Sequence, residues 1–188
     1  MIGLVSSDGD PLRRAFASVT GLPAWKVRKG HGSFLTMEFG KPHLVVREPI
    51  VAAPEASDEM RTALRRRRVY PRGEWHLWIY CCHWRALSNG TELAWSESSG
   101  EQIEAAANEI DGQVLTTVEA DPATGSSAFG FDLGGSLQTW PSSDGRMDEQ
   151  WMLYMKSGDV FTYRGDGCYS LGPGSRPIND EMWQPLGS

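Results

Sequence analysis

Two short stretches of the chain carry large apolar side chains at most positions. They are GEWHLWIY at 73–80 and DEQWMLYM at 148–155. Because the side chains of a β-strand alternate between two faces, a strand over 75–84 would be apolar on both faces, and so would a strand over 151–155. A strand of that kind is covered on both sides. We therefore predict that both strands lie at the centre of the molecule, with the rest of the chain wrapped around them.

The regions upstream of these two strands resemble each other. SFLTMEFGKPHLVVREP (33–49) and SAFGFDLGGSLQTWP (127–141) both contain an apolar strand, a glycine turn, a second apolar strand and then proline. Further upstream, TGLPAWKV (20–27) matches DGQVLTTV (111–118), with glycine and valine at the same spacing. Recurrence of several features in the same order indicates an internal duplication.

Each matching region follows a segment that has the features of a helix. DPLRRAFASV (10–19) places Asp10 as a cap and Pro11 at the first helical position, where its missing N–H costs nothing. SGEQIEAAANEI (99–110) has Ser99 as a cap, glutamate in the first turn and a run of alanines, which favour helix. We therefore predict two helices, one ahead of each β-rich region.

The predicted fold class is α+β, mostly antiparallel β-sheet built from two tandem copies of a helix-plus-β-meander unit. The first copy covers 8–97, the second copy, 98–172, packs against it as one globular unit, and 173–188 form a C-terminal tail. The alternative is two β-meanders that look alike only because they share common turn chemistry. Dipeptides typical of hairpin turns lie between the apolar runs, at Asn89-Gly90, Ser157-Gly158 and Asp166-Gly167.

The two copies differ at 51–73, which has no counterpart in the second half. Its first part is rich in alanine, proline and charged residues and is predicted to be an exposed loop. The run Arg65–Arg68 is compatible with a nucleic-acid patch. We favour the alternative, a strand that exposes its arginines beside acidic neighbours.

The overall charge limits the classes of partner. The chain has 188 residues, a formal net charge of −6 and eight tryptophans, with a pI near 5.2. A general nucleic-acid-binding protein usually presents a basic face, so no nucleic acid is expected as a partner. An acidic protein is suited to a basic protein partner, because opposite charge speeds encounter and improves selectivity.

The cysteines and the chain start bear on location. Cys81, Cys82 and Cys168 are odd in number and two are adjacent, which is not the pattern of a disulfide framework. The first residues, MIGLVSSDGDPLRR, lack the basic segment of a signal peptide. No stretch approaches the ~20 apolar residues of a transmembrane helix. We therefore predict a reduced, cytoplasmic protein that does not contact a membrane.

The segment HLWIYCCHW contains four candidate zinc ligands. On one continuous strand His76 and Cys82 would share one face, while Cys81 and His83 would share the other. At most two of the four could then meet one ion. We therefore predict no metal site, and expect the thiols to serve as small core hydrophobes.

His31 and Ser33, in the segment GHGS, are the other candidate pair, a base and a nucleophile. The matching segment of the second half, ATGSS (123–127), keeps Gly-Ser and lacks histidine, which favours a turn. The glycine-rich FDLGGSLQTW has neither the P-loop nor the dinucleotide-binding pattern. No cofactor is predicted, and no constellation indicates an enzyme.

Four segments, RKGHGSFLTMEFG, GEWHLWIYCCHW, LAWSES and FDLGGSL, together resemble an uncharacterised bacterial family. GHGSFLTMEFG is the most specific of them, and the resemblance spans most of the chain. Such small acidic proteins resemble the immunity proteins of type VI secretion nuclease toxins. The resemblance implies a protein that binds and neutralises a cognate toxin without catalysis, and it carries no catalytic residues to transfer.

A nuclease toxin has a basic substrate groove that an acidic protein could block. Exposed carboxylates in loops, with one aromatic anchor, are therefore the candidate contacts. The candidate toxin-binding residues are Asp58, Glu59, Asp121, Trp140, Asp144, Asp148 and Glu149.

Two alternatives to toxin binding come from different functional classes. One is a small-ligand-binding protein or hydrolase that uses His31 and Ser33 in a pocket between the two copies. The other is a structural homo-oligomer, such as a homodimer, joined through exposed strand edges.

Overall fold

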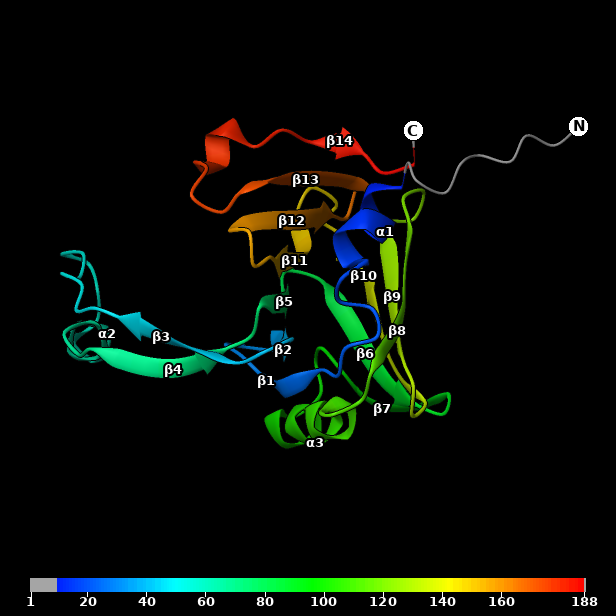
Figure 1. Cartoon of the computed structure of the whole chain (residues 1–188), viewed down its shortest axis with the longest axis horizontal. Helices are drawn as coiled ribbons and strands as arrows, with labels where there is room; N and C mark the ends of the chain where they lie inside the picture. The colour runs from blue at the N-terminus through cyan, green and yellow to red at the C-terminus, as the bar shows by residue number, and fades with distance from the viewer. Residues whose placement is uncertain (1–9, 188) are drawn as a thin grey trace, which may run out of the picture.

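The computed structural model describes residues 10–187 (Figure 1). In this region the chain forms short helices, two large antiparallel sheets and a two-stranded hairpin, so the predicted α+β fold class is confirmed. None of the helices of residues 10–187 is long and apolar enough to cross a membrane. The helices are α1 (Pro11–Phe16), α2 (Asp58–Leu64), α3 (Gly100–Ile110) and the 3-10 turn η2 (Ile178–Asp180).

The larger sheet has seven strands in the order β1-β2-β5-β11-β12-β13-β14. The segment predicted as a C-terminal tail belongs to it, because β14 pairs with β13 and Leu186 is buried. The strands are β1 (Trp25–Lys29), β2 (Leu35–Phe39), β5 (Trp75–Ile79), β11 (Glu149–Tyr154), β12 (Asp159–Arg164), β13 (Cys168–Pro173) and β14 (Gln184–Pro185).

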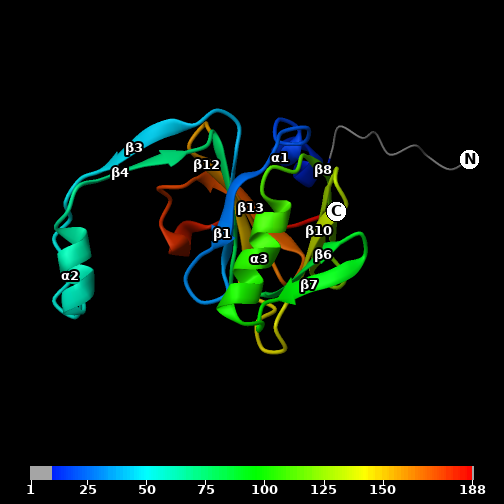
Figure 2. The same cartoon turned by 90° about the horizontal axis from the view of Figure 1, so that it is seen from below.

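The second sheet has five strands in the order β7-β6-β10-β9-β8. Helix α3 packs against β1 of the larger sheet and β7 of the smaller one, whereas α1 packs against β8 (Figure 2). The strands are β6 (His83–Ser88), β7 (Thr91–Trp95), β8 (Leu115–Asp121), β9 (Ser126–Phe131) and β10 (Gly135–Trp140).

Both predicted helices form, and their local chemistry explains where they begin. The Asp10 carboxylate accepts a hydrogen bond from the Leu12 N–H at 2.9 Å, and α1 ends earlier than predicted, at Phe16. The Ser99 hydroxyl and the Gln102 side chain each accept a hydrogen bond from the other residue's backbone N–H, so α3 begins with a capping box.

The two tryptophan-bearing strands lie side by side at the centre of the larger sheet. In the β5–β11 pair, Leu77 lies opposite Leu153 and Ile79 lies opposite Trp151. All four side chains are fully buried. The predicted central position of these strands is therefore confirmed.

One part of that prediction is wrong, because 75–84 is not one continuous strand. Strand β5 ends at Ile79, and the chain then turns into the other sheet through Cys81, which has a φ of +44°. A positive φ is uncommon for a residue with a side chain and marks a sharp turn. Cys81 is consequently exposed rather than a core hydrophobe, and only one face of β5 is fully covered, since Trp78 on the other face is half-buried.

The two halves of the chain share their sheets. The larger sheet combines β1, β2 and β5 of the first half with β11, β12 and β13 of the second, and the smaller sheet combines β6 and β7 with β8, β9 and β10. Residues 10–97 and 98–172 therefore contribute strands to the same two sheets rather than forming separate bodies. The tandem duplication itself stays a prediction.

The segment that distinguishes the two halves, 51–73, belongs to a projecting arm. Strands β3 (His43–Arg47) and β4 (Arg68–Arg72) form a hairpin with α2 at its far end, and they extend away from both sheets (Figures 1 and 2). We call residues 43–72 the arm. The predicted exposed loop is confirmed for residues 51–57, which lie outside helix and strand and are mostly exposed. The chain then forms α2, which the sequence did not indicate and which Ser57 caps, its hydroxyl accepting from the Met60 N–H at 3.2 Å.

A close backbone approach positions the base of the arm. A Cβ added at Gly73 would lie 2.4 Å from the Phe39 carbonyl oxygen, so only glycine fits where the chain returns from the arm to β5. On the other side of the arm base, the Trp25 indole N–H donates to the Gly40 carbonyl at 3.0 Å.

Candidate functional site

The register of the larger sheet gathers polar and aromatic side chains on its outer face. Arg28 lies opposite Thr36, and Thr36 lies opposite Trp78. In the next row, residues 38, 76 and 154 (Glu, His and Tyr) lie across from one another. The alternate positions of the same strands point into the core.

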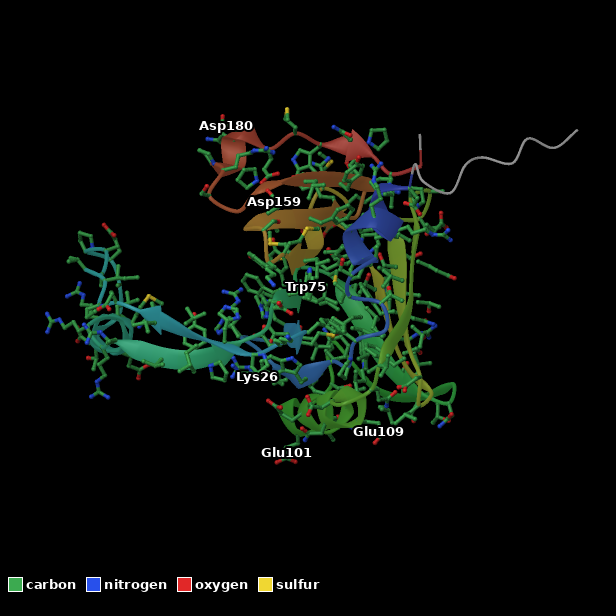
Figure 3. The ribbon with its side chains drawn as sticks, viewed as in Figure 1. Lys26, Trp75, Glu101, Glu109, Asp159 and Asp180 are labelled. Atoms are coloured by element: carbon green, nitrogen blue, oxygen red, sulfur yellow. The ribbon has the colours of Figure 1, made fainter. Side chains whose placement is uncertain are left out.

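A cleft of about 1020 Å³ lies between this outer face and the arm. We call it the basic cleft, because its lining holds five cationic side chains and one carboxylate. Figure 3 places Lys26 where the arm meets the sheet. The charged side chains of the lining are Lys26, Arg28, Arg47, Arg68, Arg72 and Glu38.

Glu38 is a buried carboxylate whose two partners, Gly73 and His76, lie close together in the sequence at the start of β5. One carboxylate oxygen lies 3.1 Å from His76 Nδ1, and the other accepts the Gly73 N–H at 3.0 Å. Burial by itself would raise the pKa of Glu38, but the adjacent His76 side chain, the Gly73 N–H and the charge of Arg72 together hold this pKa below its usual value. The carboxylate thus fixes the junction between the arm and β5.

The cationic side chains of the basic cleft differ in how they are held. The Lys26 ammonium donates to the Pro71 carbonyl at 2.8 Å, which ties β1 to the base of the arm. Arg72 lies over the Tyr154 ring, 5.4 Å from its centroid. Within residues 10–187, the guanidinium of Arg28 makes no hydrogen bond or ion pair, and it is exposed.

Aromatic rings form one wall of the basic cleft. Trp78 stacks on Tyr80 with 4.9 Å between ring centroids, and Phe34 meets Trp78 edge-on at 6.0 Å. The Tyr80 hydroxyl donates to the Glu149 carboxylate. The pKa of Tyr80 is raised mainly by burial, and to a smaller extent by this hydrogen bond and by the charge of Glu149. Trp78 is therefore held on a rigid support.

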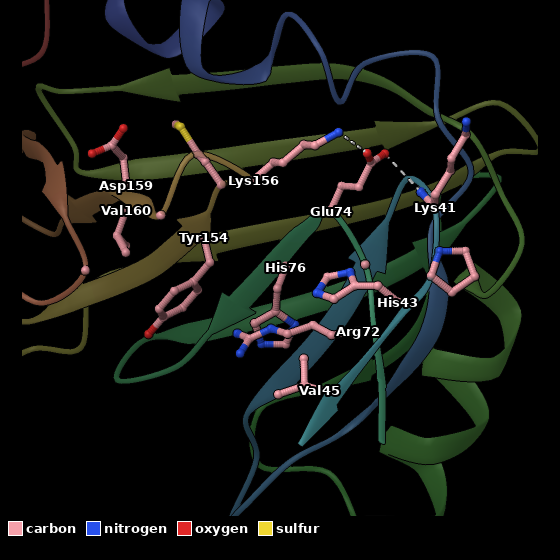
Figure 4. A pocket seen from close by; sticks show the side chains of 15 residues that line it. Lys41, His43, Val45, Arg72, Glu74, His76, Tyr154, Lys156, Asp159 and Val160 are labelled. Carbon is pink, nitrogen blue, oxygen red and sulfur yellow. Dashed lines mark hydrogen bonds and ion pairs between the residues drawn. The ribbon is translucent and has the colours of Figure 1, made fainter. Parts of the chain in front are cut away.

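A second cleft of about 640 Å³ shares Arg72, His76 and Tyr154 with the basic cleft (Figure 4). One of its two lysines is already paired, because the Lys156 ammonium lies 2.6 Å from the Glu74 carboxylate. The same carboxylate accepts a hydrogen bond from the backbone N–H of Lys41 at 3.1 Å. Less positive charge is therefore left for a ligand here than in the basic cleft.

His31 and Ser33 do not form a base–nucleophile pair. They lie in a tight turn in which the Phe34 N–H donates to the His31 carbonyl at 3.1 Å, and the Ser33 carbonyl accepts from the Trp84 indole at 2.8 Å. No hydrogen bond joins the two side chains in the described part of the chain. His31 does line the basic cleft, but the lining comes from the first half, and Tyr154 is its one contribution from the second.

The carboxylates predicted to bind a toxin do not form one surface. Asp58 and Glu59 lie in the first turn of α2, at the far end of the arm. Asp121 holds its own turn instead, accepting from the Thr124 hydroxyl at 2.8 Å and the Ala123 N–H at 3.0 Å. These two bonds lower the pKa of Asp121.

The remaining predicted contacts fall between 140 and 149. Asp144 and Asp148 are exposed in the loop before β11, while Glu149 is half-buried against Tyr80. Trp140 is half-buried and stacks on His83, with 5.9 Å between ring centroids. This end of the molecule therefore offers two free-standing carboxylates rather than a broad acidic patch.

The four zinc-ligand candidates are separated by the turn after β5. His76 contacts Glu38 on one sheet, and His83 contacts Ser96 on the other at 3.3 Å. No group of three or more His, Cys, Asp or Glu side chains in the described residues is arranged to hold a metal ion, and the three thiols are free.

Sequence reasoning missed the outer face of the arm. Directly opposed residues of a hairpin share a face, and Val46 lies opposite Val69 while Leu44 lies opposite Pro71. Leu44, Val46 and Val69 are 72%, 52% and 57% exposed, and Val69 also reaches the rim of the basic cleft. The alternation in HLVVR (43–47) could have indicated this face.

The arm and the rest of the molecule carry opposite net charges. Residues 43–72 hold seven arginines and four carboxylates, a net charge of +3. Since the whole chain carries −6, the remainder carries −9. The molecule is therefore an acidic body with a basic arm that is apolar on its outer face.

Comparisons with models of protein families, with curated proteins and with solved structures gave no match.

Proposed function

We propose that this chain is a non-catalytic binding protein, and specifically an immunity protein that neutralises a basic antibacterial toxin by covering it. The observation that carries the proposal is the apolar outer face of the arm, formed by Leu44, Val46 and Val69. The resemblance described above supports the toxin as the partner. Two of the four segments that carry the resemblance, 28–40 and 73–84, flank the arm in the sequence.

The hairpin of the arm is polar on the side that faces the sheet and apolar on the side that faces solvent. A hairpin that stays exposed to water would be expected to have a polar outer side. A two-stranded hairpin is marginal by itself, and large exposed apolar patches mark interaction sites. More than half of the exposed large apolar side chains in the described residues lie on the arm. Full burial of a valine or leucine is worth ~1.5–3 kcal/mol, so completing the burial of these three side chains would contribute about 3–6 kcal/mol to binding.

The charge of the body supports a basic partner. A body with a net charge of −9 would attract a basic nuclease domain, which speeds association and disfavours acidic partners. The arm is itself basic, so in this proposal it contributes apolar contacts while the body contributes the electrostatic attraction.

Co-expression with the product of the neighbouring gene, which the proposal expects to be the toxin, tests the proposal. The wild-type chain should protect cells, and a variant with Leu44→Ser, Val46→Ser and Val69→Ser should not. The matched control, Leu133→Ser with Leu171→Ser, removes exposed apolar side chains from the body and should still protect.

Killing that is equal with and without the wild-type chain would show that the toxin proposal is wrong. An arm-dependent dimer in sedimentation, without protection, would instead identify a second copy of this chain as the occupant of the arm.

The hydrolase alternative loses its support, because His31 and Ser33 share no hydrogen bond. The basic cleft still supports the binding of a small ligand near His31, because Phe34 and Trp78 line the cleft together with cationic side chains.

A further inference from the structure

We propose that the basic cleft binds a small organic anion with a planar ring, of the nucleoside phosphate class. The site consists of guanidinium groups from β1, β3 and β4 and of the aromatic wall formed by Phe34 and Trp78. This inference does not depend on what the outer face of the arm binds, because the basic cleft lies on the opposite side of the hairpin and shares with that face only Val69, at its rim.

The first observation is a pair of like charges. Arg47 and Arg68 lie directly opposite each other in the β3–β4 hairpin, and both line the basic cleft. Like charges at directly opposed positions destabilise a sheet. An anion between them would replace this repulsion with two charge-assisted hydrogen bonds.

The second observation is unused hydrogen-bonding capacity. The guanidiniums of Arg28 and Arg68 have no hydrogen-bond or ion-pair partner among residues 10–187. One Nη of Arg47 donates to the Ala63 carbonyl at 2.8 Å, but its buried Nε has no partner. A buried donor without an acceptor is costly, and a bound phosphate or carboxylate oxygen would satisfy it.

The single carboxylate of the lining does not compete for these arginines. Glu38 is engaged by His76 and by the Gly73 N–H. The positive charge of Arg28, Arg47 and Arg68 is therefore available to a ligand.

The aromatic wall selects for a planar ring. Trp78 is half-buried and supported by Tyr80 behind it and Phe34 at its edge, so its position is fixed before a ligand arrives. Stacking of a base on an aromatic side chain is worth ~1–3 kcal/mol. A volume of about 1020 Å³ is ample for a mononucleotide.

The charge of the body distinguishes a small anion from a polymer. A nucleic acid strand leaving the basic cleft would run over a body with a net charge of −9 and meet repulsion. A mononucleotide stays among the arginines and avoids that surface.

Calorimetric titration at low salt with adenosine 5′-monophosphate (AMP) tests the site. AMP should bind. Adenosine, which lacks the charged phosphate, and ribose 5-phosphate, which lacks the planar base, should each bind at least tenfold more weakly. Arg28→Gln with Arg68→Gln should weaken AMP binding at least tenfold, and Trp78→Leu should weaken AMP far more than ribose 5-phosphate. The matched control, Arg13→Gln with Arg146→Gln, removes two exposed arginines outside the basic cleft and should leave affinity unchanged.

Both substituted arginines of the basic cleft are exposed, so the variants are expected to fold. Thermal melts check that they do. AMP should raise the Tm of the wild type and not that of the Arg28→Gln, Arg68→Gln variant. The proposal is overturned if the wild type does not bind AMP at millimolar concentration. It is also overturned if cleft and control variants bind AMP equally, or if a single-stranded oligonucleotide binds more tightly than AMP.

Discussion

Replacing Trp151 with phenylalanine tests the packing on which the whole arrangement rests. Trp151 is fully buried, stacks on Tyr163 at 5.3 Å, and meets Phe16 edge-on at 5.7 Å, where α1 reaches the sheets. Its indole N–H donates to the Ser127 hydroxyl at 3.0 Å, which joins the larger sheet to β9. Phenylalanine would leave that buried hydroxyl unpaired and open a small cavity.

An unpaired buried hydroxyl costs ~1–3 kcal/mol. A cavity of roughly 40 Å³ costs about 1 kcal/mol more at ~24 cal/mol per Å³. We therefore expect Trp151→Phe to lower the free energy of unfolding in urea by about 2–4 kcal/mol.

Adding Ser127→Ala to Trp151→Phe removes the stranded hydroxyl and should recover about 1 kcal/mol. A loss below ~0.5 kcal/mol for Trp151→Phe, or a double variant less stable than the single one, would refute this account of the core.

Three further predictions concern the arm base, the acid range and a helix cap. Gly73→Ala should lower stability by several kcal/mol in urea denaturation, because the Cβ would clash with the Phe39 backbone. Gly100→Ala, whose added Cβ in the first turn of α3 would make only an ordinary contact with the Lys29 side chain at 3.8 Å, should be neutral or stabilising. The lowered pKa of Glu38 means that its stabilisation is present at neutral pH and is lost as the pH falls below about 4.3. Glu38→Gln should therefore flatten the fall of Tm with acidification, and an unchanged pH profile would contradict the ion pair. Ser99→Ala should cost about 1 kcal/mol by the same urea assay, because the capping box of α3 loses its hydroxyl.

Features that depend on neighbouring residues were accessible from the sequence. The caps at Asp10 and Ser99 act over two or three residues, so their side-chain chemistry alone indicated where α1 and α3 begin. The run of large apolar side chains around Trp151 likewise indicated a buried strand, and its inward face is deeply buried. The continuation of β5 past Ile79 was wrong because the turn at Cys81 uses a residue without the usual turn preference.

The arm was missed because its pairing is long-range. HLVVR (43–47) and RVYPR (68–72) are separated by 20 residues, and nothing local indicates that they pair with each other. The residues between them are rich in alanine, proline and charge, which concealed the short helix that Ser57 caps.

The basic cleft could not be predicted, because only the strand register brings its parts together. Arg28 and Arg68 are 40 residues apart in the sequence and belong to different sheets. The net charge of −6 also argued against any basic site, since it averages an acidic body with a basic arm. The predicted carboxylates failed to form a patch for the converse reason: Asp58 and Asp148 have similar sequence settings but lie on the arm and the body respectively.

Hydrogen exchange of the chain with and without the proposed toxin partner tests the central claim most directly, because it maps the contact without any substitution. The account predicts that amide protection on binding is greatest in β3, β4 and α2, within residues 43–72. Protection confined to the body, for example around Asp144 and Asp148, with exchange in the arm unchanged, would contradict the claim that the outer face of the arm is the binding surface.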